Sequence, residues 1–222
     1  MSLEIEILPD ADAVARRGAE LVAEHAAAAV AHHGSFSFAV SGGRTPWAMF
    51  ADLAGKMPWE KVTIYQVDER IAPEGDPDRN LTQLERALPP GGAADVRAMP
   101  VTAGDLDAAA ARYAAELPPQ LDLVHLGLGP DGHTASLVPG DPVLEVEDRD
   151  VALTGEYQAR RRMTLTYPVL DRARAILWLV TGDDKVEALA KLRAGDRSIP
   201  GGRVATDRAL VVADAAAAGS AS

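Results

Sequence analysis

One histidine of this chain stands in a glycine-rich turn directly after an apolar run. The turn, residues 127–140, reads GLGPDGHTASLVPG and follows the mostly apolar residues 121–126. An unperturbed imidazole has a pKa of about 6.5, so His133 can accept a proton from water near neutral pH. Asp131, two residues earlier, can hold the ring in one tautomer, as carboxylates do in other pairs that orient a base. We therefore expect His133 to be a general base and Asp131 its partner.

A second turn has the composition of an anion site. Ser41-Gly42-Gly43-Arg44-Thr45-Pro46 follows a strand expected at 35–40 and precedes a helix expected at 47–53. Glycines let backbone N–H groups approach an anion, and the helix dipole favours negative charge there. A tight turn that needs glycine only for steric reasons is an equally good interpretation, because the spacing matches neither a Walker loop nor the dinucleotide fingerprint.

A third turn, Asp68-Glu69-Arg70, follows a strand expected at 61–67. Ligands of open α/β sheets bind at the carboxyl ends of the strands, which favours a role in binding over a merely solvated turn. Because the three turns follow strands of one parallel sheet, we expect them to meet along one edge. His125, inside the apolar run, is instead expected to be a core residue with its hydrogen bonds satisfied.

Alternating strands and helices predict the fold class: an α/β protein with a doubly wound, mainly parallel sheet flanked by helices. We expect one domain over 1–214 and a disordered tail at 215–222. The first helix is expected at 10–33 and to stop at Gly34. Other strands are expected at 3–8, 96–99, 121–127, 150–154, 162–167, 175–180 and 210–212, and other helices at 81–88, 106–117 and 183–192.

Charge and composition exclude several classes of protein. The chain has 222 residues and a net charge of −11, from 22 basic and 33 acidic residues, and the basic ones are scattered. This argues against a nucleic-acid partner. No run approaches the roughly 18 to 20 apolar residues of a membrane span, and without cysteine there are no disulfides or thiolate metal sites. The acidic start is unlike a signal peptide, so we expect a cytoplasmic protein.

Four segments together resemble the 6-phosphogluconolactonases. They are residues 41–46, Gln66-Val67-Asp68-Glu69-Arg70 with Asn80 ten residues on, residues 127–137, and Arg162-Met163-Thr164-Leu165-Thr166. The resemblance covers most of the chain in the family's order. The third segment is long and specific, whereas the first two are shared with glucosamine-6-phosphate deaminases and sugar-phosphate isomerases.

The resemblance implies a Rossmann-like fold of the sugar-phosphate isomerase type and one reaction. The reaction is hydrolysis of 6-phospho-D-glucono-1,5-lactone to 6-phospho-D-gluconate, the second step of the oxidative pentose phosphate pathway. It requires no metal and no organic cofactor, and its partner is the small sugar-phosphate lactone. In such enzymes the histidine at the position of His133 is the general base. The oligomeric state stays open and is compatible with a monomer.

The remaining roles follow from side-chain chemistry. Arg70 is a candidate for stabilising the carbonyl oxygen or for binding the phosphate, and the sequence does not choose between them. Asp68 either orders Arg70 or binds sugar hydroxyls. Replacing Arg44 or Arg162 by alanine is expected to raise KM more than it lowers kcat, and a surface lysine is the alternative for Lys185. The expected substrate-binding residues are Ser41, Gly42, Gly43, Arg44, Thr45, Asn80, Gly129, Arg162 and Lys185.

Departures from the family pattern bear on the alternatives. Val138 stands where deaminases of this group carry a glutamate, and an apolar side chain cannot relay protons. It also replaces the usual phenylalanine of the lactonases. Ala159-Arg160-Arg161 replaces the usual prolines, which leaves open which of the neighbouring arginines binds substrate, and Arg79 replaces a common serine. A non-catalytic sugar-phosphate sensor is the second alternative; it is disfavoured because neither end offers room for a helix-turn-helix.

Overall fold

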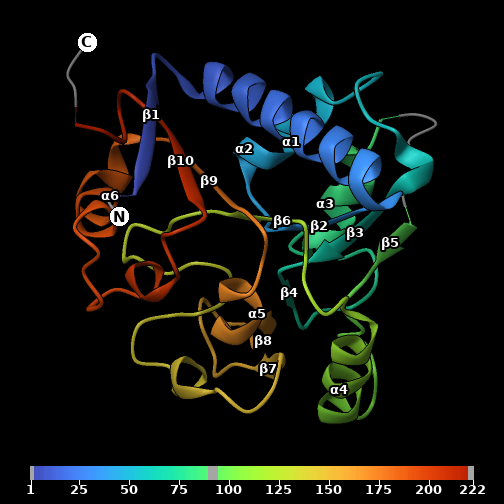
Figure 1. Ribbon diagram of the computed structural model, residues 1–222. Coiled ribbons are helices and arrows are strands. Elements are labelled where there is room, and N and C mark those ends of the chain that lie inside the picture. Colours follow the sequence, from blue (N-terminus) through green and yellow to red (C-terminus); the bar gives the residue numbers. More distant parts are fainter. Residues whose placement is uncertain (1–2, 90–94, 220–222) are drawn as a thin grey trace.

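The computed structural model describes residues 3–89 and 95–219. A seven-stranded sheet lies at its centre, in the order β1-β10-β9-β6-β2-β3-β5, and every neighbouring pair is parallel (Figure 1). This confirms the predicted doubly wound α/β fold. The strands are β1 (Glu4–Leu8), β2 (Phe36–Val40), β3 (Val62–Gln66), β5 (Asp95–Arg97), β6 (Leu123–Leu126), β9 (Ile176–Val180) and β10 (Ala209–Asp214).

The first helix has the ends that its sequence predicts. α1 (Ala11–His33) begins after Asp10, whose side chain accepts a hydrogen bond from the backbone N–H of Ala13. It ends at Gly34, where φ is +88°, a conformation that glycine adopts without strain. The remaining helices are α2 (Arg44–Asp52), α3 (Asn80–Ala87), α4 (Leu106–Glu116), α5 (Tyr167–Asp171) and α6 (Val186–Arg193), with 3₁₀ turns at Trp59–Lys61, Pro142–Glu145, Asp183–Lys185 and Gly201–Arg203.

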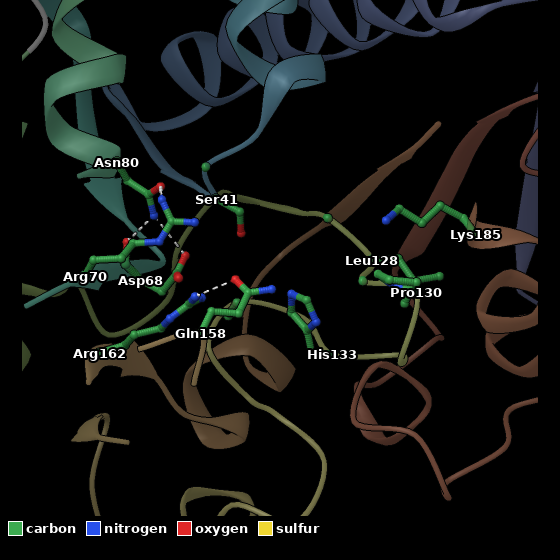
Figure 2. A pocket seen from close by; sticks show the side chains of 14 residues that line it. Ser41, Asp68, Arg70, Asn80, Leu128, Pro130, His133, Gln158, Arg162 and Lys185 are labelled. Atoms are coloured by element: carbon green, nitrogen blue, oxygen red, sulfur yellow. Dashed lines mark hydrogen bonds between the residues drawn. The ribbon is translucent and has the colours of Figure 1, made fainter. Parts of the chain in front are cut away.

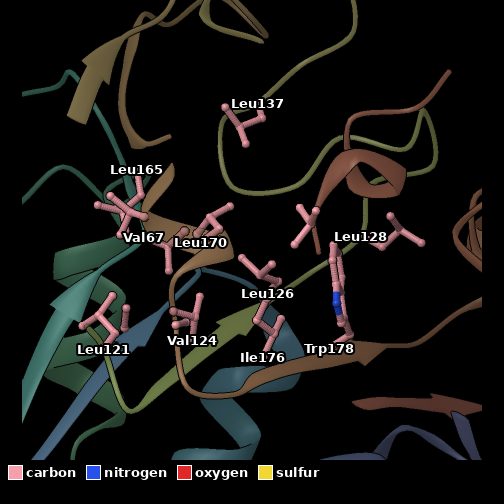
Figure 3. Close-up of a cluster of buried hydrophobic side chains, with 14 of the residues drawn as sticks. Val67, Leu121, Val124, Leu126, Leu128, Leu137, Leu165, Leu170, Ile176 and Trp178 are labelled. Atoms are coloured by element: carbon pink, nitrogen blue, oxygen red, sulfur yellow. The ribbon is translucent and has the colours of Figure 1, made fainter. Parts of the chain in front are cut away.

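Two apolar cores fill the two faces of the sheet. Residues of α1 and α2 cover one face and pack on Phe38 and Leu179. The other face is covered by α4, α5, α6 and the loops between them, around Leu126, Leu137 and Trp178 (Figure 3). Among the described helices, none is long and apolar enough to cross a membrane. The buried strands thus form a rigid support for the loops at their carboxyl ends.

A second, antiparallel sheet lies beside the first, in the order β4-β8-β7, and was not predicted. β4 (Asp68–Arg70) was expected to be a turn, yet its backbone pairs with β8 (Arg162–Leu165), which pairs in turn with β7 (Val151–Leu153). A strand of three residues is too short to show a periodic pattern, and its pairing partner is distant in sequence. In this register Arg70 lies directly opposite Arg162.

The end of the chain is packed further than the sequence suggests. Ala215 donates its N–H to the carbonyl of Leu8, and Ala217 is only 1% exposed. The side chain of Asp214 accepts from the N–H groups of both Ala217 and Gly182. The prediction of a disordered tail is therefore wrong for residues 215–219, while residues 220–222 lie outside the described part of the chain.

Candidate active site

The three turns meet at the carboxyl edge of the sheet, as expected for neighbouring strands β6, β2 and β3. They surround a pocket of about 290 Å³ (Figure 2). In this view Asp68, Arg70 and Asn80 lie on one side of the pocket, Lys185 lies on the other, and His133 lies between them. The pocket is lined by Ser41, Gly42, Asp68, Arg70, Asn80, Gly127, Leu128, Gly129, Pro130, His133, Ala135, Gln158, Arg162 and Lys185.

His133 and Asp131 form a close pair at this pocket. His133 Nδ1 lies 2.6 Å from Asp131 Oδ1, and the backbone N–H of His133 donates to the same oxygen at 3.1 Å. Burial alone would raise the pKa of Asp131, but its hydrogen bonds with His133 and Tyr157 outweigh this effect and lower the pKa below its usual value. The ionised carboxylate holds a proton on Nδ1, which leaves Nε2 as the basic nitrogen.

The turn at residues 127–133 brings this pair together. A Cβ on Gly129 would lie 2.0 Å from His133 Nδ1, so the imidazole can occupy its place only over a glycine. Gly129 also donates its N–H to the carbonyl of His133 and accepts from the N–H of Gly132, where φ is +81°. The turn is therefore a rigid loop whose shape sets the position of the ring.

Asn80 links the acidic and basic groups on the opposite wall. Its Nδ2 donates to the backbone oxygen of Asp68 at 2.9 Å, while its Oδ1 accepts from Arg70 Nη1 at 2.9 Å. Asp68 is 4% exposed, and its Oδ2 accepts from Ser136 Oγ at 2.6 Å. Asn80 thus bridges Asp68 and Arg70, and no direct ion pair joins these two residues in the described part of the chain.

Glu69 is a structural anchor beneath this wall. Its fully buried carboxylate accepts from the backbone N–H groups of Asn80 and Leu81, the first two residues of α3. It also accepts from Gln66 Nε2 and from the N–H of Arg70. These charge-assisted bonds fix the start of α3 against β4 and so hold the Asn80 side chain over the pocket.

Several buried donors in the pocket have no partner among the described residues. They are Ser41 Oγ, Arg70 Nε and Arg162 Nε. Arg162 is 4% exposed; burial lowers its pKa, the carboxylate of Asp68 acts in the opposite direction, and Arg70 adds to the lowering. Buried polar groups are normally hydrogen-bonded, so unpaired donors around a cavity are suited to an oxygen-rich ligand.

A second pocket of about 200 Å³, the glycine-turn pocket at residues 42–46, adjoins the first, the His133 pocket. The two share Gly42, Gly127, Leu128 and Lys185. The glycine-turn pocket lies at the start of α2, which has no side-chain cap and whose first intrahelical bond is Trp47 N–H to the carbonyl of Gly43. The backbone amides that precede this bond are available to an anion. The pocket is lined by Gly42, Gly43, Arg44, Thr45, Pro46, His125, Gly127, Leu128, Leu179, Val180, Thr181 and Lys185.

His125 corrects one expectation from the sequence. It is fully buried, as predicted, but neither ring nitrogen has a hydrogen-bond partner within the described residues. Burial lowers its pKa to about 3, so the ring is neutral. The strand places the imidazole between Val40 and Leu177, against the second pocket, where neither neighbouring side chain offers a polar atom.

Nearly all of the expected site residues line one of the two pockets. Asp131 lies one layer behind, against His133. Ser41 and Arg162, which were expected to help bind the phosphate, line the His133 pocket and not the glycine-turn pocket. Among the three neighbouring arginines, Arg160 pairs with Asp76 and Asp78 instead.

Two residues of the site have no signal in the sequence. Tyr157 donates its hydroxyl to Asp131 Oδ2 at 3.2 Å, and Gln158 accepts from Arg162 Nη2 at 3.2 Å. Both lie in an irregular loop without motif spacing. No group of three or more histidine, aspartate or glutamate side chains that could hold a metal ion occurs among residues 3–89 and 95–219.

Known proteins share both the sequence and this architecture. The family model for glucosamine-6-phosphate isomerases/6-phosphogluconolactonase matches residues 9–212. A 6-phosphogluconolactonase from Streptomyces coelicolor is 36% identical, over 92% of each chain, and one from Nostoc sp. is 33% identical, over 87% of this chain and 86% of its own. The crystal structure of a 6-phosphogluconolactonase from Shewanella baltica superposes with a TM-score of 0.87 over 96% of this chain and 97% of that one. At 23% identity it supports the fold alone. The chain therefore belongs to the glucosamine-6-phosphate isomerase/6-phosphogluconolactonase family.

Proposed function

We propose that this chain is an enzyme that hydrolyses 6-phospho-D-glucono-1,5-lactone to 6-phospho-D-gluconate, the second step of the oxidative pentose phosphate pathway. The observation that carries the proposal is the 2.6 Å Asp131–His133 pair at the wall of the 290 Å³ pocket. Curated relatives named 6-phosphogluconolactonase at 33–36% identity support the substrate.

The first chemical step is activation of water. His133 Nε2 removes a proton from a water molecule in the pocket while Asp131 stabilises the imidazolium that forms. The water oxygen bonds to C1 of the lactone, and the C1 carbonyl oxygen becomes an oxyanion. Arg70 and Arg162 supply positive charge on the wall that faces His133, where the low exposure of Arg162 strengthens its field.

The second step opens the ring. As the oxyanion collapses to a carboxyl group, the bond between C1 and the ring oxygen breaks. The His133 imidazolium returns its proton to that oxygen, which becomes the free hydroxyl of C5. The proton of the new carboxyl group passes to solvent, so each turnover releases one proton, and the histidine regains its starting state.

The phosphate end is assigned to the glycine-turn pocket. Arg44 and Lys185 are its cationic residues, and the uncapped amides at the start of α2 add donors. Lys185 Nζ also lies 2.6 Å from Asp184 Oδ2, an exposed pairing that a dianionic phosphate can replace. A local positive pocket of this kind binds an anion in spite of the net charge of −11.

Val138 favours a hydrolase over a deaminase. It is a buried apolar residue, 7% exposed, and contributes no acid to the site. A deaminase would need a carboxylate at position 138 for its proton transfers. Without it, His133 is left to activate water.

Proton release measured on fresh lactone tests the proposal, with wild type compared to His133→Ala. We expect wild type to exceed the spontaneous rate and the variant to fall to it. Equal rates for both above that background would refute His133 as the base. A wild type that stays at background but still binds 6-phosphogluconate would point to a sensor instead.

The substrate assignment needs a second comparison. Arg44→Ala and Lys185→Ala should raise KM for the phosphorylated lactone and leave hydrolysis of unphosphorylated glucono-1,5-lactone unchanged. If both lactones are affected alike, the phosphate does not bind in the glycine-turn pocket.

A further inference from the structure

A tight hairpin turn at residues 157–160 reaches the pocket. Its ends are closed by two reciprocal backbone hydrogen bonds, from Tyr157 N–H to the carbonyl of Arg160 at 3.0 Å and from Arg160 N–H to the carbonyl of Tyr157 at 3.2 Å. The two central residues, Gln158 and Ala159, have φ values of +52° and +60°. Side-chain-bearing residues rarely adopt this conformation, and consecutive examples near an active site point to a functional constraint.

Contacts on both sides of the hairpin hold it in this conformation. Arg160 Nη2 lies 3.1 Å from Asp76 and 3.2 Å from Asp78, in the loop before α3. Arg162 Nη2 donates to Gln158 Oε1, and the Arg162 guanidinium lies 5.0 Å from the centre of the Tyr157 ring. The turn is thus fixed to the loop before α3 on one side and, through Arg162, to the pocket wall on the other.

Tyr157 completes the surroundings of the Asp131–His133 pair. Its hydroxyl donates to Asp131 Oδ2, so that each carboxylate oxygen has its own donor. The Tyr157 ring meets the His133 ring edge to face, with centroids 5.4 Å apart. Burial and the neighbouring carboxylate raise the pKa of Tyr157, which keeps the phenol protonated and able to donate.

Gln158 presents its amide at the pocket wall, between Arg162 and His133 (Figure 2). Arg162 can only donate, so the side-chain oxygen of Gln158 must face it and the NH₂ group must point elsewhere. In the described part of the chain this NH₂ group has no partner. Gln158 and His133 line the same pocket, and the C2 hydroxyl is the lactone hydroxyl nearest to C1, so a lactone with C1 near His133 can present this hydroxyl to the free NH₂ group.

We infer that the hairpin is part of the catalytic machinery: Tyr157 is a positioning residue for the Asp131–His133 pair, and Gln158 donates a hydrogen bond to the C2 hydroxyl of the substrate. The inference rests on the lactone hydrolysis proposed above. It predicts a preference for a 2-hydroxy lactone and places its origin in a residue outside the motifs that mark the family.

Tyr157→Phe tests the positioning role, because it removes only the hydroxyl and keeps both ring contacts. We expect kcat to fall about three- to tenfold at unchanged KM, the effect of one lost hydrogen bond. The proton magnetic resonance of His133 Nδ1–H should also shift. A residue with a purely structural role would lower the melting temperature and leave both quantities unchanged, and that result would overturn the assignment.

Gln158→Ala and Gln158→Glu test substrate binding. Glutamate still accepts from Arg162 but has no NH₂ group, so both variants should raise KM by about three- to tenfold. Wild type should prefer the lactone over its 2-deoxy analogue by the same factor, and both variants should lose this preference. If they keep it, Gln158 does not read the C2 hydroxyl.

Arg161→Gln is the matched control. Among the described residues, the side chain of this exposed neighbour hydrogen-bonds only to the carbonyl of Thr154, and the variant should behave as wild type. Wild-type hydrolysis is measured first, so that an inactive wild type counts against the proposed function. An active wild type with unaffected hairpin variants counts against the hairpin alone.

Discussion

The side-chain oxygen of Asn80 lies only 1.9 Å from the position that a Cβ on Gly42 would occupy. Position 42, in the turn at residues 41–46, therefore has to be glycine, because α3 brings Asn80 too close for any side chain there. The same Asn80 oxygen accepts a hydrogen bond from Arg70, so the absence of a side chain at position 42 also affects the position of Arg70.

Gly42→Ala should therefore displace Asn80 and disturb Arg70 while leaving His133 in place. The new methyl group displaces Asn80 and removes its hydrogen bond to the side chain of Arg70, which among the described residues keeps only its bond to the carbonyl of Asp78. We expect kcat/KM to fall by about tenfold, a loss of about 1.4 kcal/mol in transition-state stabilisation. Gly104→Ala is the control, since in the described part of the chain no atom beyond the adjacent residues lies within 4 Å of a Cβ at that position. Wild-type kcat/KM in Gly42→Ala would show that the position of Asn80 is unimportant.

His125→Leu should make the protein less sensitive to acid. The pKa of His125 is lowered to about 3 in the folded state, against about 6.5 when unfolded, so only the unfolded chain binds a proton between these values. Stability is therefore lost as the pH falls below about 6.5. From pH 7 to pH 5 this one residue removes about 2 kcal/mol of unfolding free energy, and the variant should be spared that loss.

Urea unfolding at pH 7 and pH 5 measures this difference. Leucine also removes two buried nitrogens that have no partner among the described residues, so His125→Leu should already be more stable than wild type at pH 7, by about 1 to 3 kcal/mol. Ala27→Gln, at an exposed position of α1, changes no titratable group and should follow the wild-type pH dependence. An equal loss in wild type and His125→Leu would mean that the imidazole becomes charged inside the fold.

The strand ends were predictable, whereas the contacts across the pocket were not. Apolar runs and glycine turns locate β2, β3 and β6, and a parallel sheet must bring their carboxyl ends together, so His133 and Gly42 could be placed at one site from sequence. The pairing of β4 with β8 joins segments far apart in the chain and leaves no periodic signal. The Tyr157 contact with Asp131 also depends on tertiary packing, across 26 residues.

Asp131→Asn should lower kcat by about ten- to a thousandfold, because the amide no longer holds the charged imidazolium. The effect should be smaller than the roughly 10⁴-fold loss in a buried triad, since the Asp131 side chain is 36% exposed. Asp207→Asn, at an exposed carboxylate remote from the pocket, is the control. Unchanged turnover in Asp131→Asn would exclude the pair from the mechanism.

Asp131→Asn should also change how the free energy of unfolding depends on pH. The pKa of Asp131 is lowered in the folded state, so the carboxylate contributes stability above its unfolded pKa of about 4, and this contribution is lost as the pH falls through the lower folded value. The difference between wild type and Asp131→Asn should therefore be constant above about pH 5 and shrink below pH 4. A difference that grows toward low pH would contradict the lowered pKa.

The Arg44→Ala and Arg162→Ala variants should differ in their kinetic parameters, although the sequence alone predicts the same rise in KM for both. Arg44 lines only the glycine-turn pocket, whereas Arg162 lies at the His133 pocket and contacts the Tyr157 ring and Gln158. Arg44→Ala should raise KM at nearly constant kcat. Arg162→Ala should lower kcat as well, because the oxyanion loses a nearby positive charge.

Lysine does not replace this arginine. Arg162→Lys keeps the charge but loses the planar fork that donates to Gln158 and lies against Tyr157, so we expect it to recover less than about half of the lost activation free energy. Steady-state kinetics on the phosphorylated lactone, with Arg161→Ala as the exposed neighbour for comparison, measure both effects. If Arg162→Ala changes KM alone, Arg162 belongs with the phosphate, and the charge at the oxyanion comes from Arg70.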